Sequence, residues 1–345
     1  MTRTRSSLMV GTGILCCTAV LGFGAGCGGA GSTSPDGGGS GDGGSPMQGG
    51  GSGTRHRIGS SGDKACAIRD DGALECWYTT VTDLRIHPEL TNVRGVFEGG
   101  LFLFGDGTGA WLDENNYVFT PKPVVGASGG VEIAYGGTSV FWLGADGNLL
   151  ENTNYGSPAG FAPVAGATDV VDFAADGPCI VHGDHTVACG NPLEAVAGIT
   201  DAVAVTIGSG GQSCALRSGG GIVCWGRNEH GQLGDGTTTA TTGLVDVQGI
   251  SGAVDVVAGW YGGCALIGDG TVKCWGDNSQ GQLGTGSTSA TPQTGTAVPG
   301  VTSAIAITWG DRSGSLVLNR DMTFTFWGDP AIQGNGSPRT LMPDK

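Results

Sequence analysis

Cysteine is the residue type whose spacing most clearly implies chemistry in this chain. Eight of the eleven cysteines form four pairs with the same separation, namely Cys66/Cys76, Cys179/Cys189, Cys214/Cys224 and Cys264/Cys274. Each pair brackets a hairpin signature, plainest around Asp269-Gly270, where an Asp-Gly turn would place the two cysteines opposite each other. Opposed β-carbons in a hairpin lie about 4.5–5.5 Å apart, which is near the reach of a disulfide. We therefore expect four disulfides, each within one hairpin.

Zinc binding is the alternative for paired cysteines. Structural zinc sites usually separate their thiolates by about two to four residues, whereas nine residues lie between the members of each pair here. A gap of that length, centred on a turn, suits a cross-strand disulfide better. The export signal described below favours disulfides for the same reason, because they persist in oxidising compartments.

The histidines and aspartates give little support for catalysis. The five histidines are scattered, and no nucleophile elbow, H-E-x-x-H or P-loop motif occurs in the sequence. The segment His182-Gly183-Asp184-His185 could bind a metal, but a polar hairpin tip is the favoured interpretation. Asp106, Asp146 and Asp269 stand beside loop glycines, where Asp is a usual turn residue. We expect no enzyme, cofactor or metal site, with a lyase or hydrolase as the remaining catalytic alternative.

The first 54 residues are expected to lie outside the fold. Arg3 and Arg5 precede an apolar stretch that ends in Gly24-Ala25-Gly26-Cys27, as in a bacterial secretory signal over residues 1–26. A small-residue run before Cys27 resembles a lipoprotein lipobox, although Gly24 replaces the usual Leu. Cys27 would then carry lipid, and Gly28 after it favours the outer membrane by resemblance to Gram-negative lipoproteins. Cleavage to a soluble secreted protein is the alternative.

Residues 27–54 predict a disordered tether after this signal. They are almost entirely Gly, Ser, Pro, Asp and Thr, so they cannot bury enough apolar surface to offset the entropy lost on ordering. Cys16 and Cys17 lie in the signal segment, so the mature protein would keep nine cysteines. Eight of these would pair and Cys27 would carry the lipid, which leaves no free thiol.

The remainder, residues 55–345, reads as seven copies of one unit. Aligned on the hairpin, the first bridge position falls at Cys66, Leu101, Phe141, Cys179, Cys214, Cys264 and Leu316. The three copies without cysteines place Leu101 opposite Trp111, Phe141 opposite Glu151 and Leu316 opposite Phe326. Apolar residues fit a position that faces the core, and Glu151 is the exception that indicates a frayed hairpin end or a misalignment.

Each copy also contains two further β-rich runs, and no helical periodicity is present. Four short strands repeated seven times predict an all-β, seven-bladed β-propeller with four-stranded blades. A β-helix or an open stack of small sheets is the alternative. The first copy begins abruptly at Ile58 without an opening strand. We therefore expect the terminal segment Arg339-Thr340-Leu341-Met342 to pair into the first blade and close the ring.

A family resemblance supports this architecture. The run Trp225-Gly226 to Gly231-Gln232-Leu233-Gly234, and its copy from Trp275 to Gly284, resemble the repeat of the regulator of chromosome condensation family. The resemblance implies a seven-bladed propeller. The glycines of the motif suit tight turns, Leu233 and Leu283 suit the core between blades, and the Gln and Asn side chains suit turn backbone groups.

Charge and aromatic residues bear on function. A formal net charge of −15 argues against binding nucleic acid. Four tryptophans, Trp77, Trp225, Trp275 and Trp327, follow the second bridge position and predict packing between blades. Trp260 and Tyr261 instead stand in a Gly-rich loop and are the candidate exposed contact.

The sequence thus predicts an outer-membrane-anchored envelope lipoprotein with a monomeric propeller that acts as a protein-interaction scaffold. Its only membrane contact would be the lipid on Cys27. Two alternatives remain: an enzyme inhibitor, since the resemblance includes a secreted propeller that blocks β-lactamases, or a lectin that binds glycans.

Overall fold

The computed structural model describes residues 19–20 and most of residues 58–341. Within that span, the structure does not describe residues 62–63, 69–73, 79–80, 88–89, 91, 98–100, 114–119, 125–127, 137–138, 154–159, 176, 311–313 and 329–336. Cys27 and the whole predicted tether therefore lie outside the described residues. None of the described residues forms a helix long and apolar enough to cross a membrane.

The described strands form seven antiparallel sheets, numbered here in chain order. Sheet 1 comprises β2 (Ile58–Ser61), β3 (Lys64–Ile68), β4 (Leu74–Tyr78) and β5 (Val81–His87). Sheet 2 comprises β6 (Val93–Phe97), β7 (Leu101–Phe104), β8 (Gly109–Asp113) and β9 (Thr120–Pro123), with β1 (Ala19–Val20) paired to β6. Sheet 3 comprises β10 (Gly130–Gly136), β11 (Ser139–Gly144), β12 (Leu149–Asn152) and β13 (Ala162–Pro163).

The second half of the chain repeats this pattern. Sheet 4 comprises β14 (Val170–Ala174), β15 (Cys179–His182), β16 (Val187–Cys189) and β17 (Glu194–Ala195). Sheet 5 comprises β18 (Ala202–Gly208), β19 (Gln212–Arg217), β20 (Ile222–Gly226) and β21 (Thr241–Asp246). Sheet 6 comprises β22 (Ala253–Ala258), β23 (Gly262–Ile267), β24 (Val272–Asn278) and β25 (Ser289–Ala297). Sheet 7 comprises β26 (Ala304–Gly310), β27 (Gly314–Asn319), β28 (Phe324–Trp327) and β29 (Arg339–Leu341).

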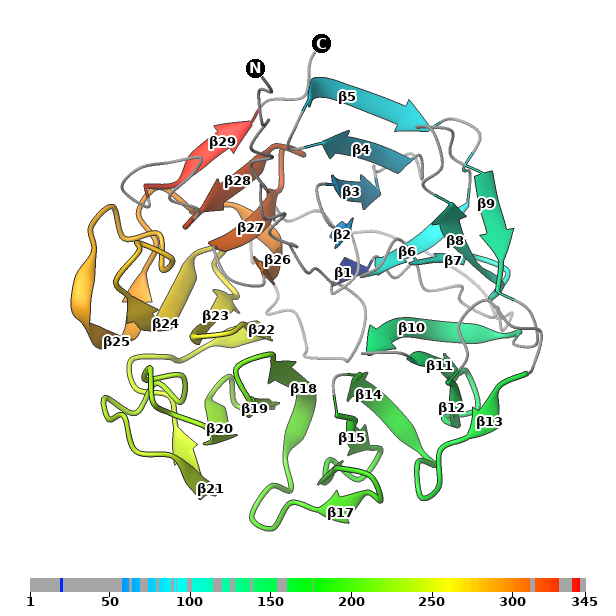
Figure 1. The fold of residues 1–345 in the computed structure, drawn as a ribbon, viewed down its shortest axis with the longest axis horizontal. Coiled ribbons are helices and arrows are strands. Elements are labelled where there is room, and N and C mark those ends of the chain that lie inside the picture. Colours follow the sequence, from blue (N-terminus) through cyan, green and yellow to red (C-terminus); the bar gives the residue numbers. More distant parts are fainter. Residues whose placement is uncertain are drawn as a thin grey trace, which may run out of the picture.

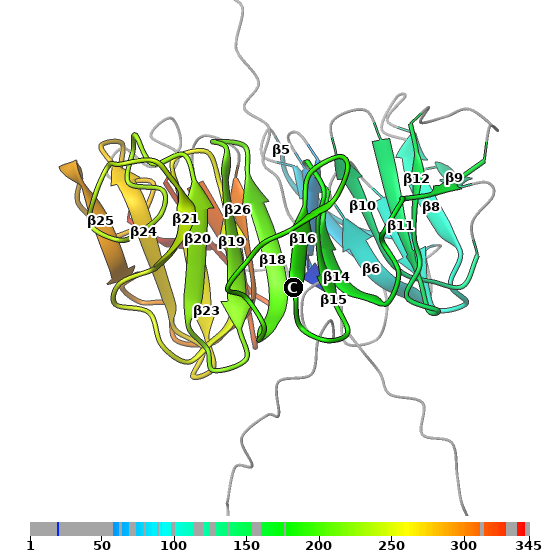
Figure 2. The same cartoon turned by 90° about the horizontal axis from the view of Figure 1, so that it is seen from below.

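The sheets surround a central axis as the blades of a propeller. In Figure 1, β2, β18, β22 and β26 lie near the centre, and β5, β21, β25 and β29 lie at the rim. Figure 2 shows the disc from its side, with the strands running roughly between its two faces. The prediction of an all-β propeller is therefore confirmed. The prediction of four-stranded blades is confirmed as well, with β1 added to sheet 2 as a fifth strand.

Strand β1 lies within the predicted signal segment and pairs with sheet 2. Ala19 pairs with Val96 and Val20 pairs with Gly95, at the inner edge of sheet 2. In the full-length chain these two residues of the predicted signal segment thus extend a sheet. The other residues assigned to that segment lie outside the described part of the chain.

Buried side chains fill each space between neighbouring sheets. Seven separate apolar clusters exist, and each contains residues of two adjacent sheets. One cluster joins the two ends of the repeat array, since Ile58 and Ala67 of sheet 1 pack with Ala306, Leu316 and Leu318 of sheet 7. Sheet 7 is therefore packed against sheet 1, and the ring is closed.

The manner of closure differs from the prediction. Strand β29 pairs with β28 of its own sheet, with Phe324 opposite Leu341 and Phe326 opposite Arg339. Sheet 1 has its own opening strand, β2, in which Ile58 is opposite Ala67. The terminal segment therefore does not enter the first blade, and the packing of side chains in this cluster joins sheet 7 to sheet 1. The opening strand was missed because Ile58-Gly59-Ser60-Ser61 contains only one apolar residue with a large side chain.

The predicted hairpin register is present in all seven sheets. Disulfides join Cys66–Cys76, Cys179–Cys189, Cys214–Cys224 and Cys264–Cys274, each with its Cα atoms 4.0 Å apart. In the other sheets Leu101 is opposite Trp111, Phe141 opposite Glu151, and Leu316 opposite Phe326. The Glu151 alignment is therefore correct, and its carboxylate accepts a 2.6 Å hydrogen bond from the Ser139 hydroxyl.

The first bridge position faces the next sheet in every copy. Cys66, Cys179, Cys214 and Cys264 belong to the clusters that sheets 1, 4, 5 and 6 share with their successors. Leu101, Phe141 and Leu316 occupy the same place in the clusters without a disulfide. A disulfide and a large apolar side chain thus serve as alternatives for filling one position of the interface between sheets.

The turn between the second and third strands is stabilised by an aspartate in most sheets. Asp269 Oδ1 accepts hydrogen bonds from the Thr271 hydroxyl (2.7 Å) and the Thr271 backbone N–H (2.9 Å). Asp106, Asp184 and Asp321 bond the threonine two residues later in the same way, and Asp146 bonds Asn148. The side-chain donor first, and then the backbone N–H, lowers the pKa of each of these five carboxyl groups.

Closure by packing predicts a specific stability effect. Leu318 is fully buried between sheets 7 and 1, so Leu318→Ala should lower the free energy of unfolding by about 2–5 kcal/mol. In a closed ring, hydrogen exchange should accelerate in β2 as well as in sheet 7. Leu266→Ala, between sheets 6 and 7, is the matched control and should cost a similar amount. A Leu318→Ala protein that loses protection only in sheet 7 would contradict closure.

The turn aspartates predict a dependence of stability on pH. Their pKa values are lowered from an ordinary value of 3.8, so the unfolded chain binds protons before the folded one does. The stabilisation is fully present above that value and is lost as the pH falls through the lower folded values. A variant in which Asn replaces all five turn aspartates should show a smaller decline in melting temperature between pH 5 and pH 2. Asp246→Asn, which changes an exposed rim aspartate, should leave the decline unchanged; equal profiles for both proteins would refute the assignment.

Candidate interaction surface

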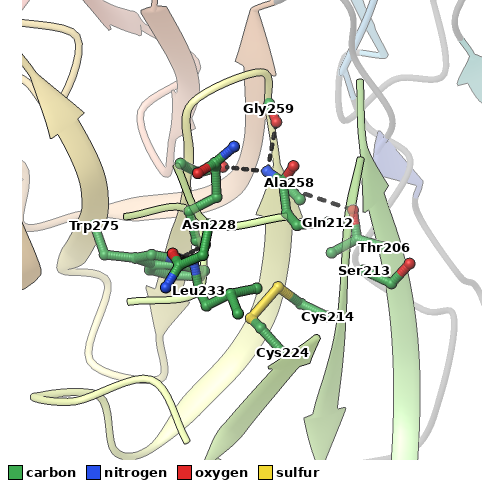
Figure 3. Close-up of a disulfide and its surroundings, with 12 residues drawn as sticks. Thr206, Gln212, Ser213, Cys214, Cys224, Asn228, Leu233, Ala258, Gly259 and Trp275 are labelled. Atoms are coloured by element: carbon green, nitrogen blue, oxygen red, sulfur yellow. Dashed lines mark hydrogen bonds between the residues drawn. A yellow bond between two sulfur atoms is a disulfide. The ribbon is translucent and has the colours of Figure 1, made fainter. Parts of the chain in front are cut away.

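The glycine-rich motif of sheet 5 packs against sheet 6. Leu233 is fully buried in the cluster that contains the Cys214–Cys224 disulfide and Trp275, as Figure 3 shows. Trp275 Nε1 donates a 2.8 Å hydrogen bond to the Gln232 carbonyl. Gly234 has a φ of +67°, and a Cβ there would lie 2.7 Å from Trp275 Cδ1. Only glycine satisfies both conditions, so this loop is shaped to receive the tryptophan of the next sheet.

The polar side chains of the motif satisfy the turn itself. Asn228 Oδ1 accepts a hydrogen bond from the Leu233 N–H (3.0 Å), and its Nδ2 donates to the Thr237 and Thr239 carbonyls, each at 3.2 Å. Gln232 Oε1 accepts from the His230 N–H at 2.8 Å. The structural interpretation of these residues is therefore confirmed.

The second copy of the motif repeats this construction one sheet later. Asn278 Oδ1 accepts from the Leu283 N–H at 3.1 Å, and Gln282 Oε1 accepts from the Gln280 N–H at 2.8 Å. Leu283 is buried together with Trp327 of sheet 7. Trp275 and Trp327 thus pack between sheets as predicted, each against the motif loop of the preceding sheet.

The histidines near the fourth hairpin do not form a common site. His182 Nδ1 lies 3.0 Å from the Thr168 carbonyl, and His185 Nδ1 lies 2.9 Å from the Ala202 carbonyl. Asp184 is committed to its turn with Thr186. Within the described ranges, no group of three or more His, Cys, Asp or Glu residues could hold a metal ion.

Trp260 and Tyr261 occupy the loop between β22 and β23. This loop lies on the face of the propeller that carries the loops between the first and second strands of each sheet. Both side chains are half-buried. Their rings are 6.1 Å apart and meet edge to face at 66°. The turns that contain the five aspartates lie on the opposite face, because they join second to third strands.

A buried glutamine from the preceding sheet holds this loop in place. Gln212 is fully buried, and its Nε2 donates to the Gly259 carbonyl (2.6 Å) and the Gly262 carbonyl (3.2 Å) on either side of the two aromatic residues. Figure 3 shows this side chain reaching from β19 to the loop. The Gly259 N–H donates to the Gly262 carbonyl at 2.9 Å, and the Asp277 N–H donates to the Tyr261 carbonyl at 2.9 Å.

Sheet 5 contributes two further side chains to the same place. The His230 ring lies against Tyr261 in a tilted arrangement, with ring centroids 4.3 Å apart and an angle of 55°. Arg227 is exposed, and its aliphatic carbons lie over Gly211, since a Cβ on that glycine would be 3.0 Å from Arg227 Cδ. A Cβ at the neighbouring Gly210 would clash with the Trp260 carbonyl. These close contacts bring Arg227, His230, Trp260 and Tyr261 together; we call this set the aromatic patch.

The sequence identified only half of the aromatic patch. Trp260 and Tyr261 could be singled out as aromatic residues in a Gly-rich loop, whereas His230 is one of five scattered histidines and carries no such signal. Arg227, His230 and Gln212 belong to a different repeat. Their proximity depends on how one sheet stacks on the next, and the motif itself gives no signal of it.

Comparisons with known proteins agree with the repeat assignment. A model of the regulator of chromosome condensation (RCC1) repeat matches residues 203–232 and 253–282, and a second model of this repeat matches residues 269–315. Among curated proteins, no sequence matches the chain.

Solved structures with similar folds include Prp20p from Saccharomyces cerevisiae, studied with its binding to Gsp1p and histones. It is 14% identical with a TM-score of 0.60, over 74% of this chain and 80% of that one. Human WBSCR16 is 15% identical with a TM-score of 0.51, over 76% and 88%. PorZ, a bacterial surface component of the type-IX secretion system of Porphyromonas gingivalis, is 13% identical with a TM-score of 0.54, over 82% and 37%. The chain thus carries RCC1 repeats within a β-propeller.

Proposed function

We propose that the protein is an exported cell-envelope lipoprotein whose seven-bladed, monomeric propeller is a protein-interaction scaffold. The observation that carries the proposal is the aromatic loop held in a fixed position. Half-buried Trp and Tyr side chains are frequent anchors of protein interfaces, and they contribute most when their loop is ordered before binding. Gln212 and the loop's own hydrogen bonds supply that order.

The remaining polar groups support binding over catalysis. The aspartates that could act as acids are engaged with turn residues, and the motif's Asn and Gln side chains hold their own loops. Propellers present loops of many strands on two faces, which suits recognition of another macromolecule. The net charge of −15 favours a protein partner over a nucleic acid.

The structural neighbours are consistent with this class of function. Prp20p was studied with protein partners, Gsp1p and histones, and PorZ is a bacterial surface component. These likenesses concern the fold, so the partner of this chain must be sought by experiment. The chain spans 37% of PorZ.

Capture from envelope extract tests the scaffold. The full-length protein, processed by its host and isolated with a C-terminal tag, should retain at least one protein that a Trp260→Ala/Tyr261→Ala variant loses, because the anchor side chains are gone. Val254→Ser is the matched control, since Val254 is 48% exposed at the opposite end of β22. Partners retained equally by all three proteins would place the interface elsewhere. Specific retention of glycans in place of proteins would favour a lectin.

The lipid anchor is tested at Cys27. Cys27→Ser should release the protein from the membrane fraction into the soluble fraction, with an unchanged melting temperature, because only the lipid is lost. Cys17→Ser, within the predicted signal segment, should leave the protein in the membrane fraction. Wild-type protein found soluble in the culture medium would refute the anchor and support simple secretion.

A further inference from the structure

We propose that the aromatic patch takes an acidic peptide segment of the partner, in which a carboxylate lies next to a large apolar side chain. This inference rests on the proposed scaffold function and specifies the chemistry of its ligand. The carboxylate would pair with the guanidinium of Arg227, and the apolar side chain would lie against Tyr261 and Trp260.

Arg227 supplies the positive charge of the aromatic patch. Its side chain is exposed and lies over Gly211, and in the described part of the chain it forms no ion pair or side-chain hydrogen bond. By contrast, Arg217 NH1 is 2.7 Å from Asp201 Oδ1. A guanidinium that is fixed by its stem but unpaired retains all its donors for a carboxylate, which it can bind through two parallel hydrogen bonds.

The positive charge of Arg227 is opposite in sign to the net charge of the molecule. The chain has 31 acidic and 16 basic residues, so an unpaired cation near two half-buried aromatic rings differs in charge from the molecule as a whole. His230, three residues after Arg227, is also exposed. Glu229 lies between them in sequence and is exposed. It is an opposing charge at the patch, as is Asp277, whose N–H donates to the Tyr261 carbonyl, and both would repel an acidic ligand.

The aromatic patch is ordered without a ligand. The His230 backbone is held by Gln232, its ring contacts Tyr261, and the Tyr261 carbonyl accepts a hydrogen bond from Asp277 N–H. The Arg227 N–H donates to the Gly211 carbonyl at 3.1 Å. Little entropy is therefore left to lose on binding, which favours recognition of a short extended segment.

The test is selection from a display library of random twelve-residue peptides. The mature full chain is the bait at low ionic strength, after depletion of the library on the Arg227→Gln variant. Enriched peptides should carry Asp or Glu beside an aromatic or large aliphatic residue more often than the input library. The tightest peptide should bind Arg227→Gln about tenfold more weakly, the loss expected for one charge-assisted pair. It should bind Glu229→Gln about twofold to threefold more tightly, because a like charge is removed.

Arg320→Gln is the matched control. It removes the same charge from an exposed side chain of the turn after β27, on the opposite face, and should leave the affinity unchanged. Melting temperatures of the three variants should equal that of the wild type, since all three side chains are exposed. Enriched peptides without acidic bias, or equal losses for Arg227→Gln and Arg320→Gln, would overturn the inference. If the envelope partner is lost by Trp260→Ala/Tyr261→Ala but kept by Arg227→Gln, the scaffold stands and the acidic-peptide specificity fails.

Discussion

Burial of side chains between adjacent sheets is the interaction on which this fold depends. A single four-stranded sheet exposes two faces. Here the two neighbouring sheets cover the two faces of each sheet. The covalent links do not cross these boundaries, because each disulfide joins two strands of one sheet. The disulfides therefore fix local hairpins, and apolar packing fixes the order and orientation of the sheets around the axis.

The sequence predicted the hairpins well because their information is local. Cysteines opposite each other, with a turn residue between them, determine the register directly, and the same alignment placed Glu151 correctly despite its charge. The manner of closure was predicted wrongly for the opposite reason. β2 is short and polar, so Ile58 alone signalled it, and the pairing of β29 with β28 instead of sheet 1 depends on contacts between residues far apart in the chain.

The candidate site shows the same division. Trp260 and Tyr261 could be proposed from residue type and the surrounding glycines. The importance of Gln212 could not, because a lone glutamine at a strand start carries no recognisable pattern, and its hydrogen bonds reach residues almost fifty positions away. The roles of Arg227 and His230 could not be predicted either. The sequence of their motif accounts for the hydrogen bonds of its own turn, but it does not indicate which residues of the neighbouring sheet its exposed side chains contact. Stacking of sheet 6 on sheet 5 creates the patch from two separate loops.

Closure without exchange of a strand has a consequence for how such a chain can evolve. Every sheet from β2 to β29 consists of strands that are consecutive in the sequence, with only β1 added from outside. The genetic unit and the structural unit therefore coincide. Duplication or loss of one repeat would add or remove a whole blade without leaving a strand unpaired, and the new ring would only have to match the two apolar faces brought together at the junction. Variation in the lengths of the outer loops between the early and late repeats is compatible with copies that diverged independently after such events.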